Sequence, residues 1–303
     1  MKDYLSAFSK RYLSAIRHLA IKPLIAKIDA IHIDVRSNQL AQVALTLQYK
    51  ELAATKRRLP AFDSVQFRVF SGEGQDGILL YIFSIVGATN KMAVELCVGD
   101  VVGSNTANLI VNHGWNALLI DGNEGAIDIN RRFYASRRDT SIWPPTMVHA
   151  WVTAENINQV IGNNGYSGEI DLLSLDIDGV DWWIWRAIDC ISPRVVVVEY
   201  NDLWGPEKSV TVPYRPDFVA EWSVDGPDYA GASLPAFVKL GKEKGYRLIG
   251  CERYGFNAFF MRNDVGEELF PEVPALSCFW HPRTKWCSEK RLPRVAHKTW
   301  VEV

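Results

Sequence analysis

The sequence predicts an α/β fold with a parallel sheet, because of its apolar runs and the residues that end them. Four short runs rich in Val, Ile and Leu follow one another and end in acidic, amide or glycine residues: Val94–Asp100, Ala117–Gly122, Asp171–Gly179 and Val195–Asn201. Such runs are typical of strands buried on both faces of a parallel sheet. Since 48% of the 303 residues are hydrophobic, the chain can bury a substantial core. The polar ends of the runs lie where an open α/β sheet binds its ligand.

Before the first of these runs, apolar residues recur at helical spacing in two stretches, Leu5–Leu19 and Leu40–Leu52. Residues 1–60 carry eleven Lys and Arg against four Asp and Glu, whereas the rest of the chain carries 22 against 31. We predict a basic helical extension over residues 1–60 that caps its own domain or forms an oligomerisation arm, which makes a homo-oligomer the expected assembly. A basic amphipathic helix resting on an anionic membrane surface, a peripheral membrane contact, is the alternative.

The first apolar run leads into a tight turn that lacks the patterns of phosphate-binding loops. Only Gly99 and Gly103 stand in it, so neither G-x-G-x-x-G nor G-x-x-x-x-G-K-[ST] is present. A turn starting Glu95-x-x-x-Gly99-Asp100 suits a ligand with an amino-acid end, because a carboxylate can bind an ammonium group there. A ring of backbone N–H groups would also satisfy a buried Glu95, but we favour the ligand. Asn105 opens the next helix, where it would bind the same ligand or act as a cap.

Asp121 ends the second run and is the main candidate for a ribose contact. It comes roughly 20 residues after the glycine turn, the distance at which α/β folds place an acid on a ribose hydroxyl. One carboxylate can accept hydrogen bonds from both hydroxyls of a ribose. We therefore predict that Asp121 and the adjoining Gly122 contact a nucleoside-bearing cofactor. A plain turn aspartate before Gly122 is the alternative.

These motifs and the segments around them resemble FkbM-type methyltransferases, which are class I S-adenosylmethionine-dependent enzymes. The similarity covers about residues 70–264 and includes the segments SGEGQDGILLYIF, ALLIDGNE, DLLSLDIDGVD and VVVVEYN. The turn departs from the family pattern E/D-x-G-x-G-x-G, since Cys97 and Val101 replace its outer glycines. The resemblance implies a Rossmann-like seven-stranded, mostly parallel sheet with one antiparallel edge strand and helices on both faces. It also implies S-adenosylmethionine as cofactor and O-methylation of sugars or natural products.

The resemblance further assigns residues 61–264 to a methyltransferase-like domain and leaves residues 265–303 as a C-terminal extension. It places Gln75 and Asp76 at the methionine end of the cofactor, although helix capping would explain them as well. Val152 ends a predicted strand at Met147–Val152 and would wall the adenine. Burial in the core is the alternative for this part of the strand.

An acidic cluster at two neighbouring strand ends carries the most chemical interest. Alternation along a strand places Asp176 and Asp178 on one side, and Glu199 and Asn201 end the neighbouring run in the same relation. Oxygen ligands of this kind suit a divalent cation such as Mg²⁺, which would be held by Asp176, Glu199 and Asn201 and would bind the acceptor. Without a metal, Asp176 or Asp178 would act as general base on the acceptor.

A purely structural interpretation of the same acids also stays open. Asp181 would then cap a helix, and the other acids would pair with Arg186 or Arg194. After the cluster, the segment Asp202–Asp228 is rich in Pro, Gly and aromatic residues. It follows a strand, so it would overhang the ligand end of the sheet as an acceptor lid, or form an ordered surface loop.

Composition narrows the function classes and the compartment. The region after residue 60 is mildly acidic, which argues against nucleic acid as a substrate, because phosphate contacts need clustered cations. Five scattered cysteines without C-x-x-C fit a reducing compartment. No stretch is long and apolar enough to span a bilayer, and the N-terminus lacks the apolar core of a signal peptide. We expect a soluble, cytoplasmic protein.

Together these observations predict an S-adenosylmethionine-dependent methyltransferase that acts on a hydroxyl of a small-molecule or glycan acceptor. Alignment of the reactants and deprotonation of the acceptor would supply most of the catalysis. The alternative is a non-catalytic binding or scaffold protein with a methyltransferase fold, in which the degraded glycine motif no longer binds the cofactor. The sequence does not name the acceptor.

Overall fold

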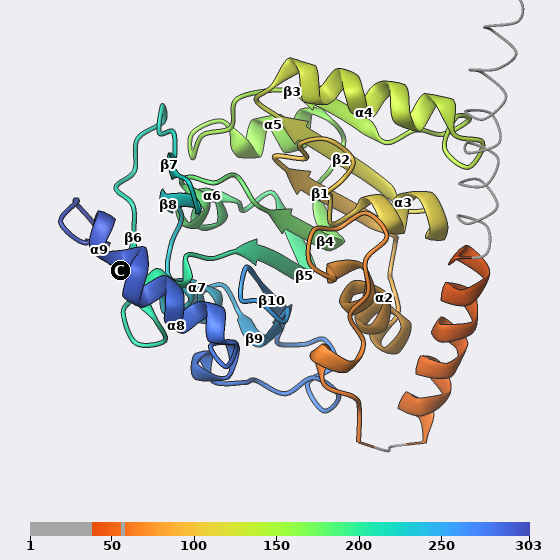
Figure 1. The fold of residues 1–303 in the computed structure, drawn as a ribbon. Coiled ribbons are helices and arrows are strands. Elements are labelled where there is room, and N and C mark those ends of the chain that lie inside the picture. The colour runs from red at the N-terminus through yellow and green to blue at the C-terminus, as the bar shows by residue number, and fades with distance from the viewer. Residues whose placement is uncertain (1–37, 56–57) are drawn as a thin grey trace, which may run out of the picture. The chain divides into compact units, whose positions relative to one another are not determined.

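The computed structural model describes residues 38–55 and 58–303 (Figure 1). The chain divides into two compact units, Met1–Glu51 and Leu52–Val303, and the sheet belongs to the second. The helix predicted at Leu5–Leu19 lies outside the described residues.

The second predicted helical stretch of the extension is confirmed. A helix covers residues 38–54, and the side chains of Leu40, Val43 and Leu47 on it are exposed. No helix in the described ranges is both long enough and apolar enough to cross a membrane.

A seven-stranded sheet forms the centre of the second unit. Its order is β3-β2-β1-β4-β5-β10-β9. The bounds in this order are Thr146–His149, Asn116–Asp121, Met92–Leu96, Gly168–Leu175, Ile191–Glu199, Asn257–Arg262 and Tyr246–Cys251. The first five strands are parallel, and β10 runs antiparallel to both β5 and β9. The predicted fold class is therefore confirmed. The reversed strand is β10, which lies next to the edge strand β9 and not at the edge itself.

The core strands form where the sequence predicts them, because their residues are β-branched or aliphatic and buried on both faces. Val195–Val198 of β5, for example, are fully buried. Two of the predicted runs are longer than the strands that form in them. The strand β1 ends at Leu96, before Cys97 with its left-handed backbone at φ of 61°. The strand β4 ends at Leu175, and Asp178 beyond it also has left-handed backbone, at φ of 49°. Alternation within a strand was therefore the wrong argument for placing Asp178.

Helices cover both faces of this sheet (Figure 1). They are α2 (Gln75–Val86), α3 (Ala107–His113), α4 (Glu124–Ser136), α5 (Ile157–Asn163), α6 (Asp181–Ala187) and α7 (Leu234–Glu243). Local signals fix several of their ends. Asn123 caps α4 by accepting from the amides of Gly125 and Ala126, and Ser233 caps α7 by accepting from the amide of Ala236.

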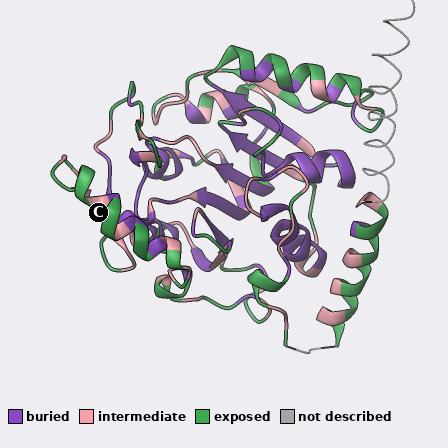
Figure 2. Cartoon of the chain, in the orientation of Figure 1, coloured by how far each residue is buried: buried purple, intermediate pink, exposed green. Residues whose placement is uncertain are grey.

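The larger hydrophobic core lies between the sheet and helices α5, α6 and α7. Trp185 of α6 packs against Phe237 of α7 and against Tyr246 and Phe260 of the sheet, at ring-centroid distances of 5.2 to 6.1 Å. Burial of each such side chain stabilises the fold by about 1.5–3 kcal/mol. Figure 2 shows the buried residues concentrated in the strands, whereas the outer side of α4 is exposed.

Short elements gather on the side toward which the parallel strands point (Figure 1). Two small sheets pair β6 with β11 and β7 with β8. The elements are η2 (Asp202–Trp204), β6 (Val210–Thr211), β7 (Glu221–Ser223), β8 (Gly226–Tyr229), α8 (Pro282–Lys290), α9 (Leu292–Val295) and β11 (Val301–Glu302). Two further 3-10 turns are η1 (Phe62–Ser64) and η3 (Ala275–Cys278). The C-terminal residues thus reach the ligand end of the sheet.

Candidate functional site

The turn after β1 is held against the end of β2. The Cys97 amide donates to Ile120 O at 2.8 Å, and the Gly99 amide donates to Asp121 Oδ2 at 2.9 Å. Gly99 and Gly103 have φ of 58° and 115°, a conformation that glycine adopts without steric cost. Cys97 keeps the same left-handed backbone, although it replaces a glycine of the family pattern. The turn thus forms without a complete glycine motif.

Glu95 is bound by the protein itself. Its neighbours Val94 and Leu96 face the larger core, so its own side chain points to the opposite face, where α3 begins. There it accepts from Ser104 Oγ at 2.7 Å, from the Asn105 amide at 2.7 Å, and from the amide and hydroxyl of Thr106.

These donors occupy both oxygens of Glu95, and only 4% of the residue is exposed. The structure therefore corrects the interpretation that Glu95 binds a ligand ammonium, in favour of the ring of protein donors. Burial raises the pKa of Glu95, and the hydrogen bonds from Thr106, Ser104 and Asn105 oppose this rise.

Asp121 lies where the sequence predicts it, at the carboxyl end of β2. Its Oδ2 accepts from the Gly99 amide, and its Oδ1 accepts from the Asn123 amide at 2.7 Å. Each carboxylate oxygen offers two acceptor positions, so both can still accept from a ligand hydroxyl. Asp121 lines a pocket, which we call the β2 slot.

The walls of the β2 slot are mostly apolar and come from four strand ends and the segment after β5. The lining residues are Cys97, Ile120, Asp121, Gly122, Ala150, Trp151, Val152, Ile177, Gly179, Val180, Pro216 and Phe218. Trp151 Nε1 donates to Pro216 O at 2.7 Å, which fixes the ring. A Cβ on Gly122 would come within 2.9 Å of Trp151 Cε3, so the ring needs a glycine here. Gly122 and Val152, which were also predicted to contact the cofactor, thus lie beside Asp121 in the β2 slot.

Gln75 and Asp76 organise the segment that leads into α2. Asp76 Oδ2 accepts from the amides of Val69, Phe70 and Ser71 at 2.7 to 2.8 Å. The Gln75 side chain bonds both the amide and the carboxylate of Glu73. Both residues are buried. These contacts favour the structural alternative over a contact with the methionine end of a cofactor.

Asp100 and Asn105 flank the turn differently. Asp100 is exposed and its Oδ1 accepts from the Val102 amide at 2.9 Å. Asn105 is buried, with its amide on Glu95 and its Nδ2 on Ser174 Oγ at 3.0 Å. Asn105 thus ties the segment before α3 to the sheet without capping the helix, whose N-cap is Thr106, whereas Asp100 remains accessible to a ligand.

The carboxylates of Asp176, Asp178 and Glu199 come together beyond the ends of β4 and β5. One oxygen of each lies within 4.8 Å of the others. Burial, together with the neighbouring charges of Asp178 and Asp181, raises the pKa of Asp176 to about 8, against the opposing effect of a hydrogen bond with Glu199. Burial and the same acids raise the pKa of Glu199 well above its usual range. The cluster therefore retains a proton near neutral pH.

Asp181 closes the loop that carries the cluster. Its carboxylate accepts from the amides of Ile177 and Gly179 at 2.8 and 3.0 Å, at the start of α6. Arg194 is paired with Asp171 at 2.9 Å instead of with the cluster. Asp181 therefore has a structural role, but it is the first residue of α6 and does not cap the helix as predicted. The predicted pairing of the cluster with Arg194 is also wrong.

The side chain of Asn201 binds the backbone beyond the end of β5. Its Oδ1 accepts from the Leu203 amide at 3.0 Å and caps η2, and its Nδ2 donates to the carbonyls of Asp228 and Ala230. The oxygen that would bind a metal is thus engaged by the backbone. Among the described acids, Asp178 stands beside Asp176 and Glu199, and Asn201 as a metal ligand stays a prediction.

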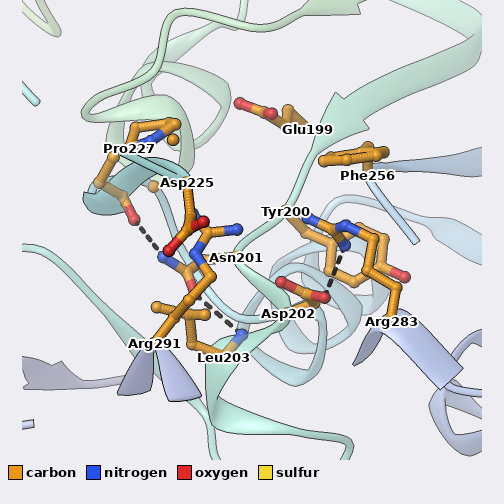
Figure 3. A pocket seen from close by; sticks show the side chains of 13 residues that line it. Glu199, Tyr200, Asn201, Asp202, Leu203, Asp225, Pro227, Phe256, Arg283 and Arg291 are labelled. Atoms are coloured by element: carbon orange, nitrogen blue, oxygen red, sulfur yellow. Dashed lines mark hydrogen bonds and ion pairs between the residues drawn. The ribbon is translucent and has the colours of Figure 1, made fainter. Parts of the chain in front are cut away.

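A second pocket, which we call the α8 pocket, opens beside Glu199 of the cluster (Figure 3). Glu199 lines it, together with residues after β5, residues around β8, Phe256 and two arginines of the C-terminal extension. Arg283 binds Asp202 at 2.7 Å, and Arg291 binds Asp228 at 2.6 Å. The segment Asp202–Asp228 contributes residues to both pockets, so it lies at the ligand end of the sheet as predicted, and its role as an acceptor lid stays a prediction.

Sequence reasoning missed Arg283, Arg291 and Phe256. The arginines stand in the C-terminal extension, far from every motif, and no spacing pattern connects them with β5. Phe256 stands in the turn between β9 and β10. Glu252 fixes this turn by accepting from the amides of Tyr254, Phe256 and Asn257.

Comparisons with known proteins show likeness only in structure. No family model and no curated protein sequence matches the chain. Magnesium protoporphyrin IX methyltransferase from Synechocystis PCC 6803, solved with bound SAM, is 10% identical over 62% of this chain and 77% of its own, with a TM-score of 0.37. The CcbJ methyltransferase from Streptomyces caelestis is 12% identical over 68% and 100%, with a TM-score of 0.38. A SAM-dependent methyltransferase from Methanosarcina mazei is 11% identical over 56% and 90%, with a TM-score of 0.36.

Proposed function

We propose that this chain is an S-adenosylmethionine-dependent methyltransferase that methylates a hydroxyl of a sugar, glycan or secondary metabolite. The observation that carries the proposal is the place of Asp121. It lines the β2 slot at the carboxyl end of the sheet and also holds the turn after β1. An acid at this position suits ribose hydroxyls, and the absence of a complete phosphate-binding loop suits a cofactor without phosphate.

The β2 slot fits the adenosine half of that cofactor. Trp151, Val152 and Phe218 offer flat and apolar walls for a purine, and Asp121 offers free acceptor positions for the ribose. The exposed Asp100 stands at the turn for the amino-acid end. When bound, the cofactor supplies an electrophilic methyl group.

The residues for proton transfer are in the acidic cluster. Asp176 and Glu199 share a hydrogen bond, and the α8 pocket reaches the cluster through Glu199. A hydroxyl bound there would pass its proton to a carboxylate whose pKa lies near 8, which suits a general base at mildly alkaline pH. Asp176 is the base in this proposal, and Asp178 tunes its pKa.

A divalent cation is the alternative way to activate the acceptor. Among the described residues, Asp176, Asp178 and Glu199 are the group of acids whose spacing would admit one. A bound cation would keep all three ionised, in contrast to the proton-sharing arrangement. The effect of a chelator on turnover separates the two.

The test of the proposed function is calorimetric titration with S-adenosylhomocysteine. A dissociation constant in the micromolar range is expected for the protein, and an Asp121→Ala variant should bind far more weakly. A folded protein that shows no binding at millimolar ligand would contradict the proposal and favour a scaffold role.

A further inference from the structure

The α8 pocket has the position and chemistry of a binding site of its own. It lies at the carboxyl end of β5 and extends from Glu199 to the C-terminal helix α8 (Figure 3). Its volume of about 140 Å³ gives room for about ten water-sized groups, comparable with a monosaccharide ring and its hydroxyls. The β2 slot is lined by Ile177 and Gly179, the chain neighbours of Asp178 in the acidic cluster.

Arg283 is held in this pocket with part of its guanidinium unused. Its Nη1 donates to Asp202 at 2.7 Å and to Tyr254 O at 3.2 Å, and its Cζ lies 3.7 Å from the centroid of Phe256. Its Nε and Nη2 have no hydrogen-bond partner among the residues that the structure describes. A guanidinium fixed by an ion pair and an aromatic ring presents its remaining donors in a defined geometry.

The charges around the pocket balance. Arg283 pairs with Asp202, Arg291 with Asp228, and Asp225 with Arg294 at 2.7 Å. The acidic cluster closes one end and would repel an anion. Such a lining both donates and accepts hydrogen bonds without a net positive charge, which suits a neutral ligand with adjacent hydroxyls.

We propose that the α8 pocket binds the methyl acceptor, that this acceptor is neutral and rich in hydroxyls, and that Arg283 determines its placement. The proposal rests on the proposed methyltransferase function. One hydroxyl reaches Glu199 and Asp176 while a neighbouring one accepts from Nε or Nη2 of Arg283. The C-terminal extension then completes the acceptor site instead of forming a separate appendage.

The experiment uses labelled methyl transfer from S-adenosylmethionine to two matched panels. One panel holds neutral methyl glycosides and inositols, and the other holds the same rings with a carboxylate or phosphate. Label is expected in the neutral panel. For the best acceptor, Arg283→Ala should raise KM about tenfold or more, change kcat by less than about threefold, and leave S-adenosylhomocysteine binding unchanged.

Two further variants keep the result interpretable. Lys285→Ala, an exposed change on the same helix, should behave as the unmodified protein. The double variant Asp202→Asn with Arg283→Ala removes the ion pair as a unit, so it avoids a buried unpaired charge and should show the same rise in KM. Arg283→Lys should keep most of the rise in KM, because lysine lacks the planar guanidinium group.

Each outcome decides one point. Label confined to the anionic panel, or to neither panel in a protein that binds S-adenosylhomocysteine, overturns the acceptor class. An unchanged KM in both arginine variants overturns the location. Failure of the unmodified protein to bind S-adenosylhomocysteine contradicts the proposed function itself and is recognised before any acceptor is added.

Discussion

Asp121 Oδ2 accepts the amide proton of Gly99 at 2.9 Å, so a side chain at the end of β2 helps to hold the turn after β1, beside the backbone hydrogen bond from Cys97 to Ile120. The turn has Cys97 and Val101 where a glycine-rich turn would carry glycines, and this bond contributes to its shape. The same carboxylate lines the β2 slot. Asp121 therefore has a structural and a ligand-binding role that substitution can separate.

Replacement of Asp121 by Ala should weaken S-adenosylhomocysteine binding by about 2–3 kcal/mol, because two charge-assisted hydrogen bonds are lost. Asp121→Asn keeps an acceptor for Gly99 and should lose about half of that free energy. Calorimetry provides the measurement. Asp128→Ala, at an exposed position on α4, is the matched control and should bind normally. Equal binding by a folded Asp121→Ala protein would show that the ribose assignment is wrong.

The sheet could be predicted from the sequence because each central strand carries its own signal. Val195–Val198 is a continuous β-branched run, which only a strand buried on both faces explains. The reversed position of β10 has no such local signal, since it depends on pairing with β5 and β9. The family resemblance implies one antiparallel strand but places it at the edge, which β9 occupies instead.

The candidate site was predictable only in part, for a physical reason that differs between residues. Asp121 ends a recognisable strand, so its position follows from local pattern. Glu95 was misassigned because a polar residue at a strand end looks the same in the sequence whether a ligand or a protein donor satisfies it. Arg283 was missed because its contact with Asp202 joins residues 81 positions apart.

The pH dependence of turnover should report the acidic cluster. Since burial raises the pKa of Asp176 to about 8, the base form grows as pH rises toward that value. Methyl transfer measured as kcat/KM should therefore increase up to about tenfold per pH unit below pH 8 and then level off. A chelator should leave this profile unchanged.

The metal alternative predicts a different profile. A bound cation would lower the pKa values of the three carboxylates, so activity would already be maximal at neutral pH and would disappear in chelator. Return of activity on addition of Mg²⁺ or Mn²⁺ to the chelated protein would then overturn the base assignment.

The same pKa shift predicts a gain in stability. The pKa of Asp176 is near 8 in the folded protein and about 3.9 in the unfolded chain, so folding is penalised increasingly as pH rises between these values. Asp176→Asn should remove this penalty and increase the free energy of unfolding by about 1–3 kcal/mol at pH 8.5, with little effect at pH 4. Urea unfolding at both pH values is the measurement.

The exposed Asp189→Asn change serves as the control for this effect and should show no pH-dependent gain. A gain of equal size at both pH values would assign the effect of Asp176→Asn to packing instead of titration. Loss of methyl transfer in the stabilised variant would support its role as base.

Trp151 provides the last prediction, because its ring links the end of β3 to the segment after β5. Nε1 donates to Pro216 O at 2.7 Å, and the ring lies against Gly122 while 53% of the residue stays exposed. If the ring walls the adenine, Trp151→Ala should weaken S-adenosylhomocysteine binding by about 1–3 kcal/mol, the usual contribution of a stacked base. Trp151→Phe keeps an aromatic face and should recover most of the affinity. Trp286→Ala, a half-exposed tryptophan on α8, should bind as the unmodified protein. Full affinity in Trp151→Ala would place the adenine elsewhere than the β2 slot.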